Sequence, residues 1–224
     1  YDSINKKWAL GQAAASRWGE ESDRSSYLLE VARLFEANHL GLINLLQREA
    51  GKTLTDAIGE IREAVDFLRY YAARPEASTL VKGRMAVCIS PWNFPLAIFT
   101  GQIAAAVVSG NAVIAKPAEQ TSLIAQAALA FWNTVLPKGV VQLVLGDGAH
   151  VGPILLNHSK ISTLAFTGST ETARRIQKIL AYSDNYATRL IAETGGLNVC
   201  IADSTALPER LVRDVVVSAF HSAG

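Results

Sequence analysis

Hydrophobic positions in the first 73 residues recur at helical spacing. Apolar side chains repeat every three or four positions, as expected for helices that each bury one face. The stripes comprise Leu28, Val31, Ala32, Leu34 and Phe35, then Leu42, Ile43, Leu45 and Leu46, then Ile61, Val65, Leu68 and Tyr71. We therefore predict an N-terminal helical segment over residues 1–73 and a linker over 74–84, where Pro75, Ser78 and Gly83 interrupt the pattern.

From residue 85 onward, short apolar runs alternate with longer helical patterns. Strands are predicted at 85–90, 112–115, 140–145, 161–166, 189–192 and 198–202, and helices at 96–108, 121–135, 151–156, 171–181 and from Pro208 to the end. Thr121 is expected to cap its helix. The alternation predicts an α/β fold with a doubly wound parallel sheet over residues 85–224. Such sheets bind ligands at the carboxyl ends of their strands, so the residues after each strand are the candidates for a site.

Charge and composition exclude several classes of partner. The 224 residues hold 21 basic and 20 acidic side chains, a balance that favours neither nucleic acid nor an anionic membrane surface. The most apolar stretch, Leu96–Ala115, contains Gln102 and Asn111 and is interpreted as a strand–helix passage in a core, not a membrane span. Two cysteines, no metal-ligand spacing and no apolar leader predict a reducing, cytoplasmic setting without a metal.

The turns after the first two predicted strands carry polar side chains close to prolines. In Ser90–Pro95, the amide of Asn93 can donate to a developing oxyanion, or it can merely cap the next helix. After the second strand, Lys116 and Glu119 can both face a ribose, where a carboxylate accepts from the hydroxyls and repels a 2′-phosphate. The alternative there is an exposed, salt-bridged turn.

Three further turns are rich in glycine or small polar residues. Gly146–Gly152 resembles a dinucleotide-binding glycine pattern with one residue too many, or is a turn that needs positive φ. Phe166–Glu171 offers backbone N–H groups to a pyrophosphate, or is an ordinary capping box. In Glu193–Gly196, the acid would serve as a general base if a dry pocket raised its pKa, or it caps a turn.

Taken in order, these five turns resemble the aldehyde dehydrogenase superfamily. Arg62–Tyr71, Ile89–Ala106 and Ala192–Asn198 narrow the resemblance to the pyrroline-5-carboxylate (L-glutamate γ-semialdehyde) dehydrogenase module of bacterial proline utilisation A. The resemblance implies a Rossmann-like NAD-binding domain and NAD-dependent oxidation of that semialdehyde to glutamate in proline catabolism. Two alternatives stay open, namely another aldehyde dehydrogenase such as a succinate semialdehyde type, and a nucleotide-binding module without chemistry.

The resemblance also implies a role for individual side chains. Asn93 would hold the oxyanion, and Glu193 would activate the water that hydrolyses a thioester. Residues expected to bind NAD are Lys116 and Glu119 at the adenosine ribose, Gly148 near the adenine, Gly168 and Ser169 at the pyrophosphate, Gly195 near the nicotinamide, and Ile89, Ser90, Pro91, Trp92, Gly152 and Phe166 elsewhere along the cofactor. Glu63 and Phe94 match positions near the aldehyde, where Glu63 faces an ammonium group; its alternative is a solvated helix charge.

The nucleophile of the superfamily is a cysteine expected a few residues beyond Gly224. Cys88 and Cys200 lie in apolar runs and are interpreted as buried core thiols. We therefore expect the 224 residues alone to be inactive and the parent protein to be active, as a homo-oligomer. Whether a proline dehydrogenase domain is fused to it stays open.

Overall fold

The computed structural model describes residues 2–74, 84–158, 161–197 and 199–222. The chain divides into two compact units, Tyr1–Thr194 and Gly195–Gly224, and each is described by itself.

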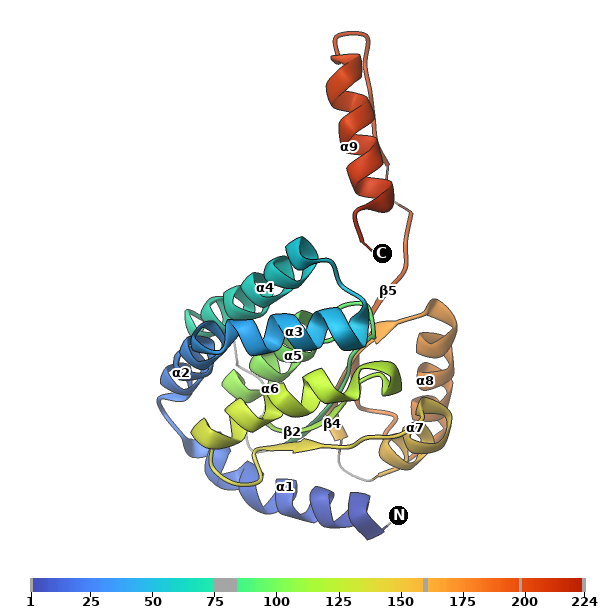
Figure 1. The fold of residues 1–224 in the computed structure, drawn as a ribbon. Helices are drawn as coiled ribbons and strands as arrows, with labels where there is room; N and C mark the ends of the chain where they lie inside the picture. Colours follow the sequence, from blue (N-terminus) through green and yellow to red (C-terminus); the bar gives the residue numbers. More distant parts are fainter. Residues whose placement is uncertain (1, 75–83, 159–160, 198, 223–224) are drawn as a thin grey trace. The chain divides into compact units, whose positions relative to one another are not determined.

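Four helices open the first unit, within the segment predicted to be helical, and the three apolar stripes fall on the last three of them. They are α1 (Asp2–Glu20), α2 (Arg24–Ala37), α3 (His39–Ala50) and α4 (Leu54–Ala72) (Figure 1). Local sequence sets their ends. Asp23 caps α2, Gly51 ends α3 in the left-handed conformation at φ 65°, and the Thr53 hydroxyl accepts from the Asp56 N–H to start α4. The predicted linker falls mostly on residues outside the described ranges.

A five-stranded parallel sheet follows, with the order β3-β2-β1-β4-β5. The strands are β1 (Met85–Ile89), β2 (Ala112–Lys116), β3 (Val141–Leu143), β4 (Ile161–Gly168) and β5 (Arg189–Thr194). The prediction of a doubly wound α/β sheet is confirmed. The winding direction reverses between β1 and β4, and a sheet of this kind opens its ligand crevice at that switch point.

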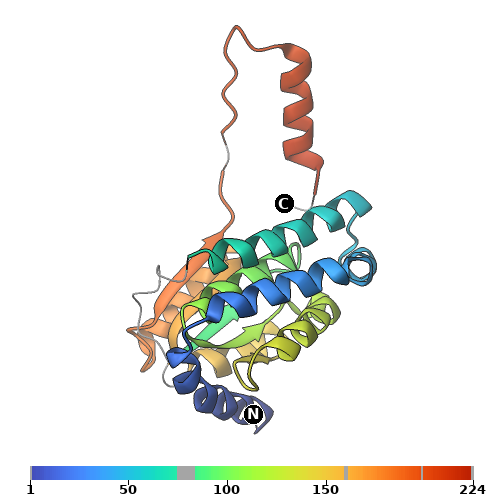
Figure 2. The same cartoon turned by 90° about the vertical axis from the view of Figure 1, so that its left-hand side faces the viewer.

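Helices cover both faces of the sheet, and alternate strand residues face each layer. They are α5 (Ala97–Val108), α6 (Ser122–Val135), preceded by the short 3₁₀ helix η2 (Glu119–Thr121), α7 (Gly148–Leu156) and α8 (Thr170–Tyr182). Ala86 and Cys88 pack with α2 to α6, whereas Met85 and Val87 pack with α7 and α8. Helix α1 contributes side chains to both layers. It runs along the lower side of the first unit in both views (Figures 1 and 2).

The second unit contains α9 (Pro208–Phe220), which begins with a proline in its first turn, as predicted. The predicted strand at 198–202 is wrong for the described residues 199–202, which form no strand. An apolar run becomes a strand only beside a hydrogen-bonding partner, and the described part of this unit offers none.

The expected cap at Thr121 is also wrong. Thr121 occupies the N-cap position of α6, but its hydroxyl makes no capping bond. The carboxylate of Glu49 from α3 takes that place, accepting from the N–H groups of Leu123 at 2.7 Å and Ile124 at 2.8 Å. The apolar stretch Leu96–Ala115 forms α5 and part of β2, and no helix in the described ranges is long and apolar enough to cross a bilayer.

Candidate active site at the strand ends

The carboxyl ends of neighbouring strands bring the predicted site residues of the first unit to one edge of the sheet. In the strand register, Ile89 pairs with both Lys116 and Phe166, and Thr167 pairs with Glu193. Residues that are up to about a hundred positions apart in sequence are therefore level with one another across β2, β1, β4 and β5.

The turn after β1 does not use Asn93 as the cap of the next helix. Helix α5 begins after Leu96, three residues further on, so the capping alternative for Asn93 is wrong. Asn93 is half-buried, as are Pro91 and Phe94, whereas Trp92 is exposed. Ser90 is buried, and its hydroxyl finds no hydrogen-bond partner in the part of the chain that the structure describes.

A buried carboxylate from α4 caps α5 instead. Glu60 Oε1 accepts from the backbone N–H groups of Leu96 at 2.7 Å and Ala97 at 3.3 Å. Its other oxygen lies 3.1 Å from Lys52 Nζ, with side-chain exposures of 1% for Glu60 and 5% for Lys52. The same ammonium lies 4.2 Å from the centre of the Phe94 ring. Sequence reasoning missed both residues, although a glutamate on the apolar stripe of α4 was a signal.

A side-chain amide from α5 ties the two strands at the switch point. Gln102 Nε2 donates to the Ile89 carbonyl at 3.2 Å and to Thr167 Oγ1 at 3.1 Å. These bonds join the ends of β1 and β4, which do not follow one another along the chain. Gln102 therefore holds the spacing of the crevice edge, a role that the sequence pattern did not reveal.

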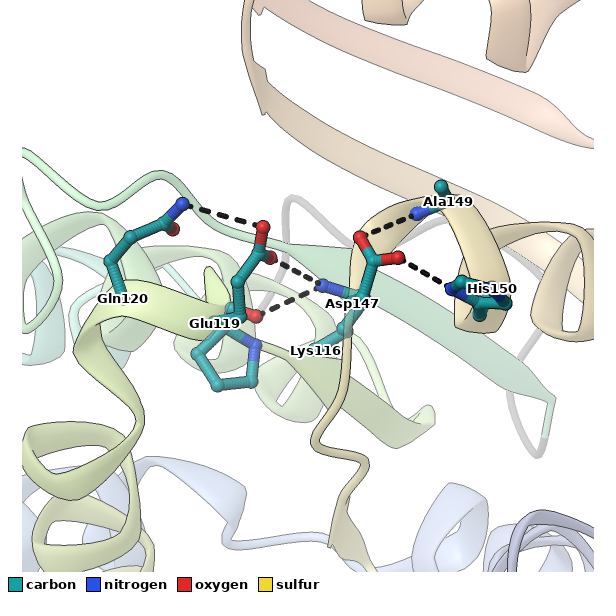
Figure 3. A network of polar contacts seen from close by, with 7 residues as sticks. Lys116, Glu119, Gln120, Asp147, Ala149 and His150 are labelled. Carbon is teal, nitrogen blue, oxygen red and sulfur yellow. Dashed lines mark hydrogen bonds and ion pairs between the residues drawn. The ribbon is translucent and has the colours of Figure 1, made fainter.

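The turns after β2 and β3 meet at the ammonium of Lys116 (Figure 3). Lys116 is buried, with Nζ 3.2 Å from the Pro117 carbonyl and 3.8 Å from Glu119 Oε2. A Cβ atom on Gly148 would lie 3.8 Å from that nitrogen. Burial lowers the pKa of Lys116, while the Glu119 and Asp147 carboxylates act in the opposite direction. The alternative of an exposed, salt-bridged turn therefore holds in part, because Lys116 and Glu119 form the ion pair and Glu119 is exposed, whereas Lys116 is buried.

The glycine turn after β3 has the backbone that its sequence predicts. Gly146 has φ 137°, which a residue with a side chain rarely adopts. Asp147 then caps α7 by accepting from the Ala149 N–H at 3.1 Å. That bond, followed by the contact with His150, lowers the pKa of Asp147. Gly152 lies inside α7, with no atom close to where its Cβ would be, so nothing near it explains a glycine.

The turn after β4 is a helix cap. Ser169 Oγ accepts from the Thr172 N–H at 3.1 Å, which confirms the capping interpretation. A Cβ atom on Gly168 would come within 2.7 Å of the Phe166 ring, so this backbone approach requires glycine. A cofactor role for Phe166, Gly168 and Ser169 stays a prediction.

A cavity of about 540 Å³ lies beside the switch point, between α4, α5 and the strands β4 and β5. Its wall includes Glu63 and Phe67 from α4, Gln102 from α5, and Thr167 and Glu193 from the strands. Glu63 is exposed, yet partial desolvation by its surroundings raises its pKa, with the Glu60 carboxylate as a lesser cause. Glu193 is exposed, so the described residues alone do not form the dry pocket expected around it.

The cavity thus brings together Glu63 and Glu193, which the sequence assigned to substrate and base. Asn93 and Phe94 do not line it; they belong to the turn anchored by Lys52 and Glu60. Gly195 lies in the second unit, and its predicted place near the nicotinamide stays a prediction.

Comparison with known proteins identifies the family. The family model described as "Aldehyde dehydrogenase family" matches residues 2–224. The chain belongs to the aldehyde dehydrogenase family. The superfamily resemblance of the strand-end motifs is thereby confirmed.

Among the relatives of this aldehyde dehydrogenase chain are proteins named for proline utilisation. It is 51% identical over 224 residues to "Bifunctional protein PutA" of Salmonella typhimurium, covering 96% of the chain and 17% of that protein. It is 32% identical over 245 residues to a 1-pyrroline-5-carboxylate dehydrogenase of Staphylococcus aureus, covering all of the chain and 46% of that protein. The chain therefore spans less than half the length of either relative.

Solved structures show the same fold. A crystal structure of a variant of proline utilization A from Bradyrhizobium japonicum matches with a TM-score of 0.91 and 45% identity over 98% of the chain and 24% of that structure. An NAD-dependent benzaldehyde dehydrogenase from Corynebacterium glutamicum matches with a TM-score of 0.79 and 25% identity over 86% of the chain and 45% of that structure.

The strand-end residues of this aldehyde dehydrogenase chain fit a nicotinamide dinucleotide. The buried Ser90 hydroxyl lacks a partner among the described residues, the Lys116 and Glu119 side chains supply a donor and an acceptor within one turn, and α8 presents its N-terminus. Hydroxyl, phosphate and amide groups of a dinucleotide would complement this set.

The two cysteines of this aldehyde dehydrogenase chain differ in environment. Cys88 is buried in β1, as expected, and burial raises its pKa to about 12. At neutral pH it is a protonated core thiol and a poor nucleophile. Cys200 is exposed, so the expectation of a buried thiol is wrong there; its unit has no fully buried side chain among its described residues.

Proposed function

We propose that the protein containing this chain oxidises L-glutamate γ-semialdehyde, formed from pyrroline-5-carboxylate, to L-glutamate with NAD. The observation that carries the proposal is the cavity shared by Glu63 and Glu193. One carboxylate suits the ammonium group of the substrate, and the other suits activation of water near the reacting carbon. Similarity to proteins named PutA and 1-pyrroline-5-carboxylate dehydrogenase supports this choice of aldehyde.

The reaction begins with attack of a cysteine thiolate on the aldehyde carbon, and the carbonyl oxygen becomes an oxyanion. We place the Asn93 amide as a donor to that oxygen. NAD, held by the turns after β2, β3 and β4, would supply the hydride acceptor, and loss of the hydride from the former aldehyde carbon would leave a thioester. Glu193 then takes a proton from water as the water oxygen attacks the thioester, and the thiolate leaves as glutamate is released.

The cysteine that this chemistry requires is proposed to lie outside the 224 residues. Cys88 is buried with a raised pKa and lies inside a strand. Since the chain covers only 17% of its PutA relative, we also propose that the whole protein carries further parts, with a proline dehydrogenase domain among them. We further propose that it acts in the cytoplasm as a homo-oligomer.

Cofactor choice is assigned to the turn after β2. Lys116 and Glu119 would hold the adenosine ribose, with the carboxylate accepting from its hydroxyls. A 2′-phosphate would meet the Glu119 charge, so we propose NAD over NADP. Gly148, beside the Lys116 ammonium, leaves room for the adenine.

The test uses the full-length protein with glutamate semialdehyde, following NADH in the first turnover and at steady state. Replacing Glu193→Gln should preserve a burst of one NADH per site, because hydride transfer precedes hydrolysis, and slow the steady rate by about 10²–10⁴-fold. Glu30→Gln on the exposed face of α2 is the matched control and should behave as the wild type. A wild-type protein that forms no NADH refutes the proposed activity, and an unchanged steady rate in Glu193→Gln refutes the role of Glu193.

A further inference from the structure

We propose that Lys52 and Glu60 are positioning residues that hold the Asn93 turn in register for the reaction. The proposal rests on the proposed function, because it gives the turn a catalytic task. Neither side chain lines the cavity or a strand end. They act through Phe94, which directly follows Asn93, and through the backbone of Leu96 and Ala97 at the start of α5.

Glu60 fixes the end of the turn where α5 begins. Leu96 occupies the N-cap position and has no side-chain acceptor for the free N–H groups of the helix. Glu60 lies on α4, 36 residues before Leu96, and its Oε1 accepts from both the Leu96 and the Ala97 N–H. The start of α5 is therefore set by the position of α4, and a carboxylate there also interacts favourably with the helix dipole.

Lys52 contacts the same turn at the residue after Asn93. Its ammonium lies 3.1 Å from Glu60 Oε2 and 4.2 Å from the centre of the Phe94 ring. Phe94 directly follows Asn93, so the two contacts grip the turn on the residue after the amide and at the helix start. A cation over an aromatic face is strongest where water is excluded, and the Lys52 side chain is 5% exposed.

A second glutamate shows what capping alone looks like. Glu49 accepts two backbone N–H groups at the start of α6, at 2.7 and 2.8 Å. Glu49 is half-buried and its carboxylate makes no ion pair among those described, whereas Glu60 is buried against an ammonium. Removing two charges from water is costly, and an apolar pair would often be at least as stable. The buried pair therefore points to a requirement for geometry in the Asn93 turn, since a misplacement of about 1 Å in a site can slow a reaction by about 10²-fold.

The experiment compares Glu60→Gln with Glu49→Gln in the full-length protein. Glu60→Gln keeps the shape and one acceptor but removes the charge that faces Lys52. We expect its kcat for the semialdehyde to fall by about 10²-fold, with the KM for NAD changed less than about threefold. In Glu49→Gln, kcat should stay within about threefold of the wild type, because its cap lies on α6.

Hydrogen exchange gives a readout that does not depend on activity. In Glu60→Gln, the amides of Leu96 and Ala97 should exchange about tenfold faster, because a bond to a neutral acceptor is weaker than one to a carboxylate. In Glu49→Gln, the faster exchange should appear at Leu123 and Ile124 instead. A structural role spread over the whole fold would speed exchange at both places in both variants.

A charge-conserving variant covers the case in which Glu60→Gln does not fold. Glu60→Asp keeps the ion pair neutral overall but withdraws the carboxylate by one methylene, and its kcat should fall by about tenfold. The proposal is overturned if the folded variant, Glu60→Gln or Glu60→Asp, keeps wild-type kcat, or if exchange at Leu96 and Ala97 is unchanged. An inactive wild type refutes the proposed function alone, and the exchange data then still decide whether Glu60 holds the turn.

Discussion

The turns after β1 and β2 leave adjacent strands, yet they are held in different ways. The β1 turn is contacted by a buried ion pair from outside the turn. The β2 turn has one buried ammonium and an exposed carboxylate 3.8 Å away. A donor to a short-lived oxyanion must not move, whereas groups that bind ribose hydroxyls can adjust as the ligand enters. The contrast teaches that the helical segment gives rigidity to the turn assigned to chemistry and leaves the turn assigned to binding more open.

The largest predicted change is a loss of stability when the cation that contacts the β1 turn is removed. Lys52→Met leaves the Glu60 carboxylate buried without its counter-charge, and the free energy of unfolding should fall by about 3–5 kcal/mol. Urea unfolding measures it. The double variant Lys52→Met with Glu60→Gln buries no net charge and should recover much of that loss. A double variant that is less stable than Lys52→Met would contradict the unpaired charge as the cause.

A smaller effect is expected from the carboxylate of the β2 turn. Glu119→Ala removes the acceptor for the ribose hydroxyls, so NAD binding should weaken by about 1.5–3 kcal/mol while NADP binding changes less. Titration calorimetry on the full-length protein measures both cofactors. Gln126→Ala, exposed on α6, is the control. Parallel losses for NAD and NADP would argue against a ribose contact.

Removing the cap of α6 should reduce stability by a still smaller amount. Glu49→Ala removes a half-buried acceptor from Leu123 and Ile124 without stranding a buried charge, and the free energy of unfolding should fall by about 1 kcal/mol. Gln47→Ala, exposed on the same helix, controls for the change of α3 itself. If Glu49→Ala cost as much as Lys52→Met, the contrast between the two turns would be lost.

The smallest expected effect is the contribution of Lys116 to the pH dependence of stability. Burial lowers the pKa of Lys116, so the unfolded chain holds this proton more tightly than the folded protein does. The protonated amine therefore opposes folding fully below its folded pKa, and the cost fades as pH rises through that pKa toward the ordinary value of 10.5. Relative to Lys116→Met, the wild type should gain stability over that alkaline range. The free energy of unfolding of each protein is measured at several pH values. A difference between the two proteins that stays constant across this range would contradict the prediction.

Regular elements and their order could be predicted because each depends on a local pattern. The apolar stripes predicted within residues 28–35 and 61–71 lie on α2 and α4, and the bounds predicted for β1 and β2 agree with the structure to within one residue. The alternation of strand and helix then sets the sheet type. The strand expected at 198–202 failed because strand formation also needs a neighbour, which no local pattern supplies.

The polar contacts that cross between elements could not be predicted in this way. Glu60, with its partner Lys52, lies beside the start of α5 only because α4 packs there in the folded chain. Likewise, Glu49 from α3 provides the cap of α6 that was expected from Thr121. Gln102 bonds to two strands that become neighbours only through the order of the sheet. The sequence shows such residues only as polar side chains among apolar ones, without naming their partners.

The strand order has a consequence for anyone who handles the isolated chain. Of the two edges of the described sheet, β3 has three residues and β5 has six, and β5 exposes Ile191 along with its unpaired backbone. Short edges resist sideways association, whereas long ones invite a strand from another molecule. Self-association of a preparation should therefore begin along β5, and a charged residue at position 191 is the first change to make for solubility.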